Sequence, residues 1–370
     1  MAHSSRTRIL IVDDSAVIRS LLRTVVCADP TLEVAGTAAD GVTALHAIES
    51  LRPDLVLLDV EMPNMDGLAT LRTLRAREYR MPVVMVSSVT QRGARVTIDA
   101  LACGASDYVT KPSNQVDRET ALRVLAQDLL PTIQALTVSA VAQSRCPPVP
   151  MDRTESVKIS LTPPSVVVVG VSTGGPAALD VLLSAIPQGF PLPVLVVQHM
   201  PELFTGPLAE RLRQRCSVRV REAAEGAPVI PGVIYIARGN WHMEVLAATR
   251  AGLPPTLHLH QGPPENHCRP AVDVLFRSAA ALFGPATLAI VLTGMGSDGL
   301  AACRIIHALG GTVLAQDQST SAVWGMPGSV IQAGLAQRVL PLPSIAPEIL
   351  RIVGRNTGEL RGFREPAVQR

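Results

Sequence analysis

Short apolar runs alternate with amphipathic stretches along the first third of the chain. Runs rich in Val, Ile and Leu occupy residues 9–12, 32–36, 55–58, 83–86 and 107–109. Between them, apolar residues recur at helical spacing, as in 16–27, 41–51 and 67–77. Runs that are apolar throughout are typical of parallel strands buried on both faces. The pattern predicts a five-stranded, doubly wound βα domain over residues 1–131, which binds ligands at the carboxyl ends of its strands.

The periodicity fades after this domain and then returns. Residues 132–162 contain Pro147, Pro148 and Pro150 among polar residues, which predicts a linker. The first part of this segment could also extend the last helix. A second pattern begins with the very apolar run at 165–169 and predicts a Rossmann-like domain over 163–354. Residues 355–370 form a polar tail. We therefore expect an α/β chain of two doubly wound parallel-sheet domains.

Composition narrows the range of functions. A length of 370 residues exceeds what one hydrophobic core usually serves. The net charge of +2 predicts no nucleic-acid partner. The six cysteines are scattered without a Cys-x-x-Cys pair, which favours free thiols in a reducing compartment. Because no signal peptide and no apolar stretch of about 20 residues is evident, we expect a cytoplasmic protein without direct membrane insertion.

Acidic and basic side chains gather at the predicted strand ends of the first domain. The residues at these ends are Asp13, Asp14, Asp59, Ser87 and Lys111. Parallel strands bring them to one edge of the sheet, where crowded carboxylates need a hard counter-ion such as Mg²⁺. The chain uses arginine nearly everywhere and lysine only at Lys111 and Lys158, which favours a compact point charge at Lys111.

Helix capping is the alternative explanation for the two adjacent aspartates. It explains neither Asp59 nor Lys111. We therefore interpret the cluster as a phosphorylation switch, in which the metal and Lys111 offset the charge of a phosphoryl group on Asp59. Ser87 would donate a hydrogen bond to that group.

This segment strongly resembles a response-regulator receiver domain. The resemblance lies in VDDS at 12–15, LDVEMP at 58–63, DG at 66–67 and TKP at 110–112. It implies that Asp59 is the phosphoacceptor and that a histidine kinase supplies the phosphate. The implied Mg²⁺ ligands are Asp13, Asp14, Asp59 and the backbone carbonyl of Glu61. The implied phosphate-reading residues are Ser87, Tyr108 and Lys111.

A glycine-rich turn begins the second domain. Ser172 lies in GVSTGG at 170–175, between an apolar run and the helical pattern at 176–186. A strand-turn-helix of this kind presents a hydroxyl at a helix amino terminus, where backbone N–H groups can stabilise an oxyanion. A dinucleotide site would instead need Gly-x-Gly-x-x-Gly and an acidic residue ending the next strand. Here the next run, 194–198, leads into His199.

His199 and Asp298 complete a possible triad. A histidine at a neighbouring strand end is the general base that a serine nucleophile needs. Asp298 follows the apolar run at 289–292 and could hold the imidazole in its working tautomer. A satisfied histidine and a helix-capping aspartate are the structural alternatives. The order Ser-His-Asp differs from the Ser-Asp-His order of α/β-hydrolases.

Nearly the whole chain resembles a chemotaxis response regulator protein-glutamate methylesterase. The further matching blocks are QHMP at 198–201, RP at 269–270, DVLF at 273–276 and LTGMG at 292–296. The resemblance implies that Ser172 hydrolyses glutamate methyl esters on the cytoplasmic helices of chemoreceptors, releasing methanol, and deamidates glutamines there. His199 would shuttle the proton, and Asp298 would orient the His199 ring. No cofactor would be needed at this site. Backbone N–H groups near Thr173 and Met295 are the candidate oxyanion hole.

Other residues carry weaker signals. Three could shape a substrate groove or be structural: Met200, His242 and Arg269. His258 and His260 would share one strand face as a metal pair without an evident third ligand. His267 beside Cys268 could indicate a thiol nucleophile, but no turn chemistry supports it.

The simplest coupling of the two domains makes the receiver an inhibitory lid over Ser172. A tenfold activation needs only about 1.4 kcal/mol of differential binding. Two rival functions remain. A binding module would dock on a partner without using the triad. A transcription factor would need a basic helix-turn-helix pattern, which the sequence lacks.

Overall fold

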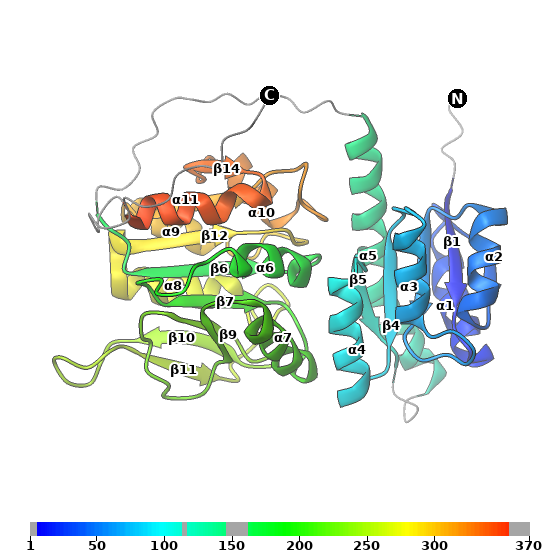
Figure 1. Ribbon diagram of the computed structural model, residues 1–370, viewed down its shortest axis with the longest axis horizontal. Coiled ribbons are helices and arrows are strands. Elements are labelled where there is room, and N and C mark those ends of the chain that lie inside the picture. Colours follow the sequence, from blue (N-terminus) through cyan, green and yellow to red (C-terminus); the bar gives the residue numbers. More distant parts are fainter. Residues whose placement is uncertain (1–5, 113–116, 146–161, 355–370) are drawn as a thin grey trace.

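The computed structural model describes residues 6–112, 117–145 and 162–354, with only the backbone given for 138–145. The first of its two α/β domains has a parallel sheet of order β2-β1-β3-β4-β5 (Figure 1). Its strands are β1 (Thr7–Val12), β2 (Leu32–Ala38), β3 (Leu55–Asp59), β4 (Val83–Ser87) and β5 (Asp107–Thr110). Its helices are α1 (Ala16–Ala28), α2 (Gly41–Leu51), α3 (Gly67–Ala76), α4 (Gln91–Ala102) and α5 (Arg118–Arg145). The predicted doubly wound fold is confirmed.

Local capping fixes where the helices of this domain begin. Asp66 and Thr90 accept the backbone N–H groups of Ala69 at 2.7 Å and Gly93 at 2.9 Å. Helix α1 begins after Ser15, whose hydroxyl accepts a hydrogen bond from Ile18 N. Neither Asp13 nor Asp14 is therefore the N-cap residue. This removes the capping alternative for the acid pair.

Helix α5 continues through Pro131 to Arg145. The first part of the segment interpreted as a linker is therefore helical, which is the extension that the sequence left open. The rest of that segment, 146–161, and the tail at 355–370 lie outside the described residues. Within the described part of the chain, no helix has both the length and the apolar character needed to cross a bilayer.

The second domain has a seven-stranded sheet of order β14-β13-β12-β6-β7-β9-β8, with parallel pairing between every two neighbours. The strands are β6 (Val166–Val171), β7 (Val194–Gln198), β8 (Arg219–Glu222), β9 (Val233–Ile236), β12 (Thr287–Val291), β13 (Thr312–Gln316) and β14 (Arg338–Leu340). An antiparallel hairpin, β10 (His242–Leu246) with β11 (Thr256–His260), is an addition that the sequence pattern does not predict.

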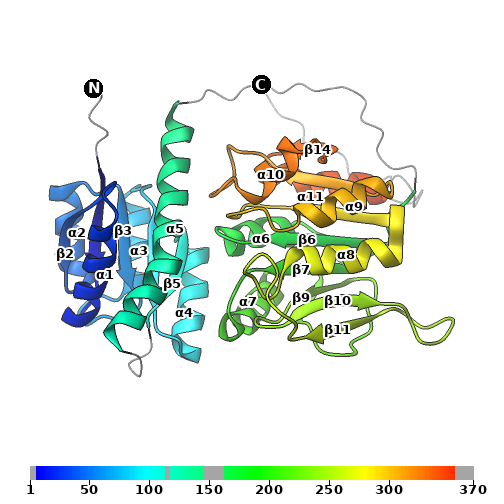
Figure 2. The same cartoon turned by 180° about the vertical axis from the view of Figure 1, so that it is seen from behind.

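Helices cover both faces of this sheet, as Figures 1 and 2 show from opposite sides. One face packs against α6 (Gly175–Ser184), α7 (Glu202–Arg215) and α11 (Leu342–Gly354). The other packs against α8 (Val272–Phe283), α9 (Leu300–Ala308) and α10 (Met326–Gln332). A short 3₁₀ helix, η1 (Gly284–Ala286), links α8 to β12. The central strands are consequently buried and mostly apolar, as the sequence predicts, whereas the edge strands β8 and β14 carry exposed arginines.

The two domains meet through α4 and the β5–α5 edge of the first domain (Figure 2). Ile98 of α4 belongs to the same buried apolar cluster as Leu208 of α7. Tyr108 stacks on Phe204 with ring centroids 4.7 Å apart. Arg211 on α7 pairs with Asp99 on α4, with 2.9 Å between Nη1 and Oδ1. The interface is therefore apolar at its centre and has an ion pair beside it.

Candidate active site and acid cluster

The acid cluster forms at the carboxyl edge of the first sheet. Lys111 Nζ lies 2.8 Å from Asp13 Oδ2 and 2.8 Å from Asp59 Oδ1. Both carboxylates are buried, whereas Asp14 is exposed. Glu61 N donates to Asp59 Oδ1 at 3.4 Å, so the Glu61 backbone lies at the same edge. The structure thus brings together the residues that the strand ends predicted.

The donor set of this cluster fits a hard divalent cation. Asp13, Asp14 and Asp59 each offer a carboxylate oxygen, and these oxygens lie within 4.8 Å of one another. Asp59 Oδ2 is buried without a hydrogen-bond partner among the described residues. An unpaired buried carboxylate oxygen is costly unless a cation or a covalent group engages it.

Ser87 and Tyr108 lie between the acid cluster and the second domain. The buried Ser87 hydroxyl accepts a hydrogen bond from Thr97 Oγ1 on α4 at 2.8 Å. Tyr108 reaches the second domain through its stack on Phe204. Ser87 and Thr97 therefore link the acid edge to α4, and Tyr108 links β5 to α7.

Replacing Asp59 by asparagine is expected to stabilise the metal-free protein at neutral pH. Burial raises the pKa of Asp59 to about 6, although Lys111 acts in the opposite direction. Ionisation of this carboxyl therefore costs stability, and the cost grows as pH rises from the ordinary aspartate range through about 6. It is absent below that range and amounts to at most about 3 kcal/mol at pH 7.

Urea unfolding of the wild type and Asp59→Asn at acid and neutral pH would measure this difference. Asp14→Asn, which removes the exposed neighbouring charge, is the matched control. An Asp59→Asn chain that is less stable than the wild type at pH 7 would contradict the expected penalty.

The Ser172 turn connects β6 to α6. Ser172 N donates to Thr293 O at 3.0 Å, and Gly175 N donates to Ser172 O at 2.8 Å. Gly174 has a φ of 76°, and a Cβ there would lie 2.5 Å from Ala322 Cβ. A Cβ on Gly175 would lie 1.9 Å from Gln198 Oε1. Glycine is therefore required at both positions for the turn to pack.

His199 lies beside this turn because β6 and β7 are neighbours. His199 N donates to Val171 O at 3.1 Å, which continues the parallel pairing past the end of the strands. The buried Gln198 side chain donates from Nε2 to Ser172 O at 3.0 Å and to His199 O at 3.1 Å. Gln198 thereby fixes the nucleophile turn and the histidine relative to one another.

Asp298 holds one nitrogen of the His199 ring, with 2.7 Å between Nε2 and Oδ2. Its carboxylate also accepts the backbone N–H groups of Val272 at 2.7 Å and Asp273 at 3.0 Å, in the first turn of α8. Asn266 Nδ2 donates to it at 2.8 Å. A helix amino terminus favours negative charge, so this set keeps Asp298 ionised while buried.

The electrostatics of the pair favour a charged histidine. Burial alone would lower the pKa of His199, but hydrogen bonds with Asp298 and Cys268 outweigh it and raise the pKa to about 9. Burial alone would raise the pKa of Asp298, but hydrogen bonds from His199 and the α8 backbone lower it. The pKa values of His199 and Asp298 shift in opposite directions for one reason, because the two side chains form an ion pair that is buried away from water.

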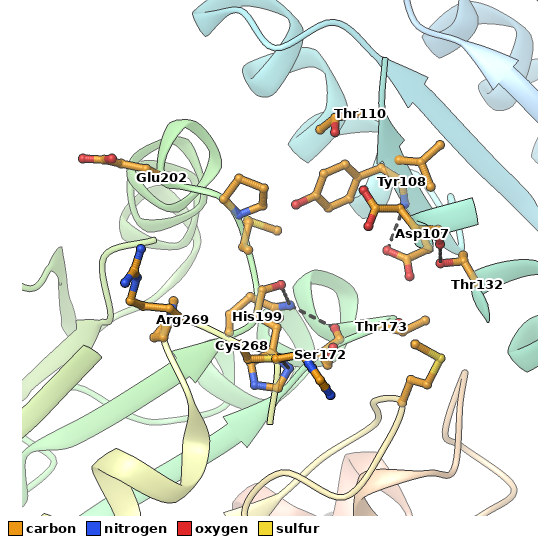
Figure 3. A pocket seen from close by; sticks show the side chains of 18 of the residues that line it. Asp107, Tyr108, Thr110, Thr132, Ser172, Thr173, His199, Glu202, Cys268 and Arg269 are labelled. Carbon is orange, nitrogen blue, oxygen red and sulfur yellow. Dashed lines mark hydrogen bonds between the residues drawn. The ribbon is translucent and has the colours of Figure 1, made fainter. Parts of the chain in front are cut away.

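The second ring nitrogen of His199 faces a thiol. Cys268 Sγ lies 3.6 Å from His199 Nδ1. Among the described residues, no hydrogen bond joins the Ser172 hydroxyl to this ring. Figure 3 shows Ser172, His199 and Cys268 together on one wall of the pocket. The sequence raises Cys268 only as a weak nucleophile candidate, whereas the fold places it within contact of His199.

The site opens into a cavity of about 680 Å³ between the domains. Ser172, Thr173 and His199 line one side, and Tyr108 lines the other (Figure 3). Met295 also lines the cavity. The backbone N–H groups of Thr173 and Met295 donate to no acceptor in the described part of the chain. Neither N–H group is therefore used within the described part of the chain.

A carboxylate of the first domain reaches this cavity. Asp107, at the start of β5, accepts a hydrogen bond from the Thr173 hydroxyl. Burial raises the pKa of Asp107 to about 6. The first domain thus places a carboxyl group beside the residue that follows Ser172. When ionised, this carboxyl would disfavour an oxyanion there as long as the domains stay closed.

The weaker sequence candidates have structural partners. Arg269 lines the cavity and donates to Asn240 Oδ1 and to the carbonyl of Gly262 at 2.8 Å. His242 is buried between Pro263 O at 3.0 Å and Ala271 N at 3.3 Å. Met200 is buried and also lines the cavity. His258 and His260 share a face of β11, and each lies beside a glutamate. His242 pairs with His260 across the hairpin, with ring centroids 5.2 Å apart.

Comparisons with known proteins match both halves of the chain. Residues 167–349 match the family described as CheB methylesterase, and residues 9–123 match the response regulator receiver domain. A protein-glutamate methylesterase/protein-glutamine glutaminase of Nocardioides sp. is 49% identical over 95% of this chain and 97% of that protein. The protein of the same description from Trichodesmium erythraeum is 46% identical over 94% of this chain and 99% of its own length.

One solved structure resembles the second domain. The crystal structure of the Thermotoga maritima CheB methylesterase catalytic domain is 41% identical, with a TM-score of 0.50. It covers 52% of this chain and 100% of the other. The similarity therefore extends over the domain that holds Ser172.

Proposed function

The chain belongs to the CheB methylesterase family of hydrolases, with a receiver domain ahead of the catalytic domain, and from this premise we propose a phosphorylation-regulated protein-glutamate methylesterase. Its substrates are methylated glutamates, and also glutamines, on the cytoplasmic domains of chemoreceptors. It acts in the cytoplasm, binds no nucleic acid and does not insert into the membrane. The observation that carries the proposal is the His199–Asp298 pair, 2.7 Å apart beside the Ser172 turn.

In the first half-reaction, Ser172 Oγ attacks the ester carbonyl. For this step His199 must be neutral, with its Nε2–H donated to Asp298 and its Nδ1 lone pair free to take the serine proton. The proton then passes to the methoxy oxygen, and methanol leaves as the glutamyl-serine ester forms. The free N–H groups of Thr173 and Met295 stabilise the oxyanion.

In the second half-reaction, His199 takes a proton from water, and the hydroxide attacks the glutamyl ester. The proton returns to Ser172 Oγ as the glutamate carboxylate leaves. Deamidation follows the same course, with ammonia as the first leaving group. The chemistry needs no cofactor at this site.

Regulation resides in the acid cluster. Asp59 is the phosphoacceptor, and a chemotaxis histidine kinase supplies the phosphate. Asp13, Asp14, Asp59 and the Glu61 carbonyl would hold Mg²⁺, which would supply positive charge to offset the phosphoryl group. Ser87, Lys111 and Tyr108 read the phosphoryl group. Because Tyr108 stacks on Phe204 and Asp107 contacts Thr173, their movement would open the cavity to substrate.

A pH profile tests the role of His199. Since the base must be neutral, kcat/KM of the unphosphorylated full chain is expected to rise with pH up to about 9. Cys268→Ala should move this rise to lower pH, because the hydrogen bond with Cys268 contributes to the raised pKa. A profile already flat at pH 7 in the wild type would contradict the assignment.

Loosening the domain interface tests the inhibitory lid. Arg211→Gln removes the ion pair between α7 and α4, which is expected to raise unphosphorylated activity about two- to fivefold. Arg213→Gln is the matched control, because Arg213 pairs with Glu210 within the same helix, at 2.7 Å. Equal rates for the two variants, measured as methanol release, would argue against the lid.

A binding module that docks on chemoreceptors without turnover is the rival. Methanol release from membranes carrying methylated chemoreceptors separates the two. Release that requires Ser172 supports the hydrolase. Receptor binding without release, by both the wild type and Ser172→Ala, would support the rival.

A further inference from the structure

Cys268 has no role in the proposed reaction, yet the fold holds it firmly beside His199. Glu265 N donates to Cys268 O at 3.1 Å, and Cys268 N donates to Glu265 O at 2.9 Å. Between them, Asn266 and His267 have φ values of 52° and 63°, as in a type I′ turn. Asn266 Nδ2 also bonds Asp298 at 2.8 Å. The turn that carries the thiol is therefore tied to the triad.

The distance between the thiol and the ring matches a metal site. Zinc bonds sulfur at about 2.3 Å and imidazole nitrogen at about 2.0–2.1 Å, so a tetrahedral ion separates these two ligands by about 3.5 Å. Cys268 Sγ and His199 Nδ1 are 3.6 Å apart. A zinc ion bound by both of these atoms would therefore require little movement of either side chain.

Asp298 supplies the second element of such a site. Histidines that bind zinc usually donate their other ring N–H to a carboxylate, which fixes the tautomer and increases the basicity of the metal-bound nitrogen. Asp298 accepts at His199 Nε2, which leaves Nδ1 as the free ligand. Ligand atoms of His199, Cys268 and Asp298 all lie within 4.8 Å of one another.

We propose that His199 Nδ1 and Cys268 Sγ form an inhibitory site for a thiophilic divalent metal ion of the zinc class. Asp298 supports the site from the outer shell, and water from the cavity fills the remaining positions. Binding releases the thiol proton and, where His199 is protonated, its Nδ1 proton to solvent, and the metal occupies the lone pair that would accept the Ser172 proton. The ion thus blocks general-base catalysis without any contribution from the receiver domain.

The two candidate metal sites on this chain differ in ligand chemistry. The acid cluster offers only carboxylate oxygens, which suit magnesium, whereas this site offers sulfur and imidazole, which suit zinc. Excess magnesium can therefore saturate the first while the second is titrated.

The test uses the full chain with excess Mg²⁺ and no substrate, titrated with Co²⁺ as a spectroscopic probe for zinc. A thiolate-to-cobalt charge-transfer band should appear, disappear on addition of Zn²⁺, and be absent from Cys268→Ser. Cys27→Ser, which removes an exposed thiol on α1, should keep the band. No band in the wild type, or an undiminished band in Cys268→Ser, would overturn the proposal.

Turnover gives a second readout. Half-inhibition by zinc should require at least about tenfold more metal in Cys268→Ser than in the wild type, which corresponds to about 1.4 kcal/mol. Equal zinc sensitivity of the two chains would also overturn the proposal. Because the cobalt band needs no substrate, failure of the metal site is distinguishable from failure of the proposed reaction.

Discussion

Replacing Ser172 by alanine is expected to lower methanol release from methylated receptors by at least about 10⁴-fold. The loss is large because, in the proposed reaction, the hydroxyl forms the covalent intermediate. The backbone of the turn is held by Thr293 O and Gly175 N rather than by the hydroxyl, so folding should be unaffected. Methanol released by Ser172→Ala, measured in samples quenched over several hours, would give the residual rate.

Ser184→Ala is the matched control, because Ser184 is exposed at the end of α6, the helix that follows the Ser172 turn. It should release methanol at the wild-type rate. A residual rate in Ser172→Ala that disappears only when Cys268 is also replaced would contradict serine catalysis, since the thiol also touches His199.

Removing the receiver domain is expected to give an enzyme that needs no phosphate. A fragment that begins near Thr162 retains the whole seven-stranded sheet and the buried cluster on its α8–α9 face. It loses Asp107 and Tyr108 from the cavity wall. Its rate should exceed that of the unphosphorylated full chain by at least about tenfold, the effect of about 1.4 kcal/mol of lost closure.

The rates of the fragment, the full chain and the phosphorylated full chain on the same receptor membranes would check this. The fragment carrying Ser172→Ala gives the background. A folded fragment that is as slow as the unphosphorylated full chain would exclude the inhibitory lid.

The sequence predicted the two sheets because their central strands are mostly apolar and regularly spaced. Strand ends then located Asp59, Lys111, Ser172, His199 and Asp298 without any tertiary information. The antiparallel hairpin was missed because β10 and β11 bury alternate residues and lie outside the parallel pattern. The boundary of α5 was left open because the apolar periodicity fades in the segment 132–162, whereas the helix continues to Arg145.

Contacts between distant segments could not be predicted in this way. Cys268 approaches His199 only through the turn at Asn266 and His267, whose positive φ values are not evident from residue spacing. Asp107 approaches Thr173 only because the two domains pack together. Gln198 reads as the last residue of an apolar strand, and its role in fixing the Ser172 turn depends on side-chain direction. Residue spacing alone therefore did not reveal that Cys268, Asp107 and Gln198 lie around the candidate triad.

The most direct test of the central claim is methanol release by the full chain with and without Mg²⁺ and a small-molecule phosphodonor, beside Asp59→Asn. We predict slow release from the unphosphorylated chain, faster release with both additions, and no acceleration of Asp59→Asn. Release that is independent of the phosphodonor, or acceleration that persists in Asp59→Asn, would contradict a hydrolase switched by phosphorylation of Asp59.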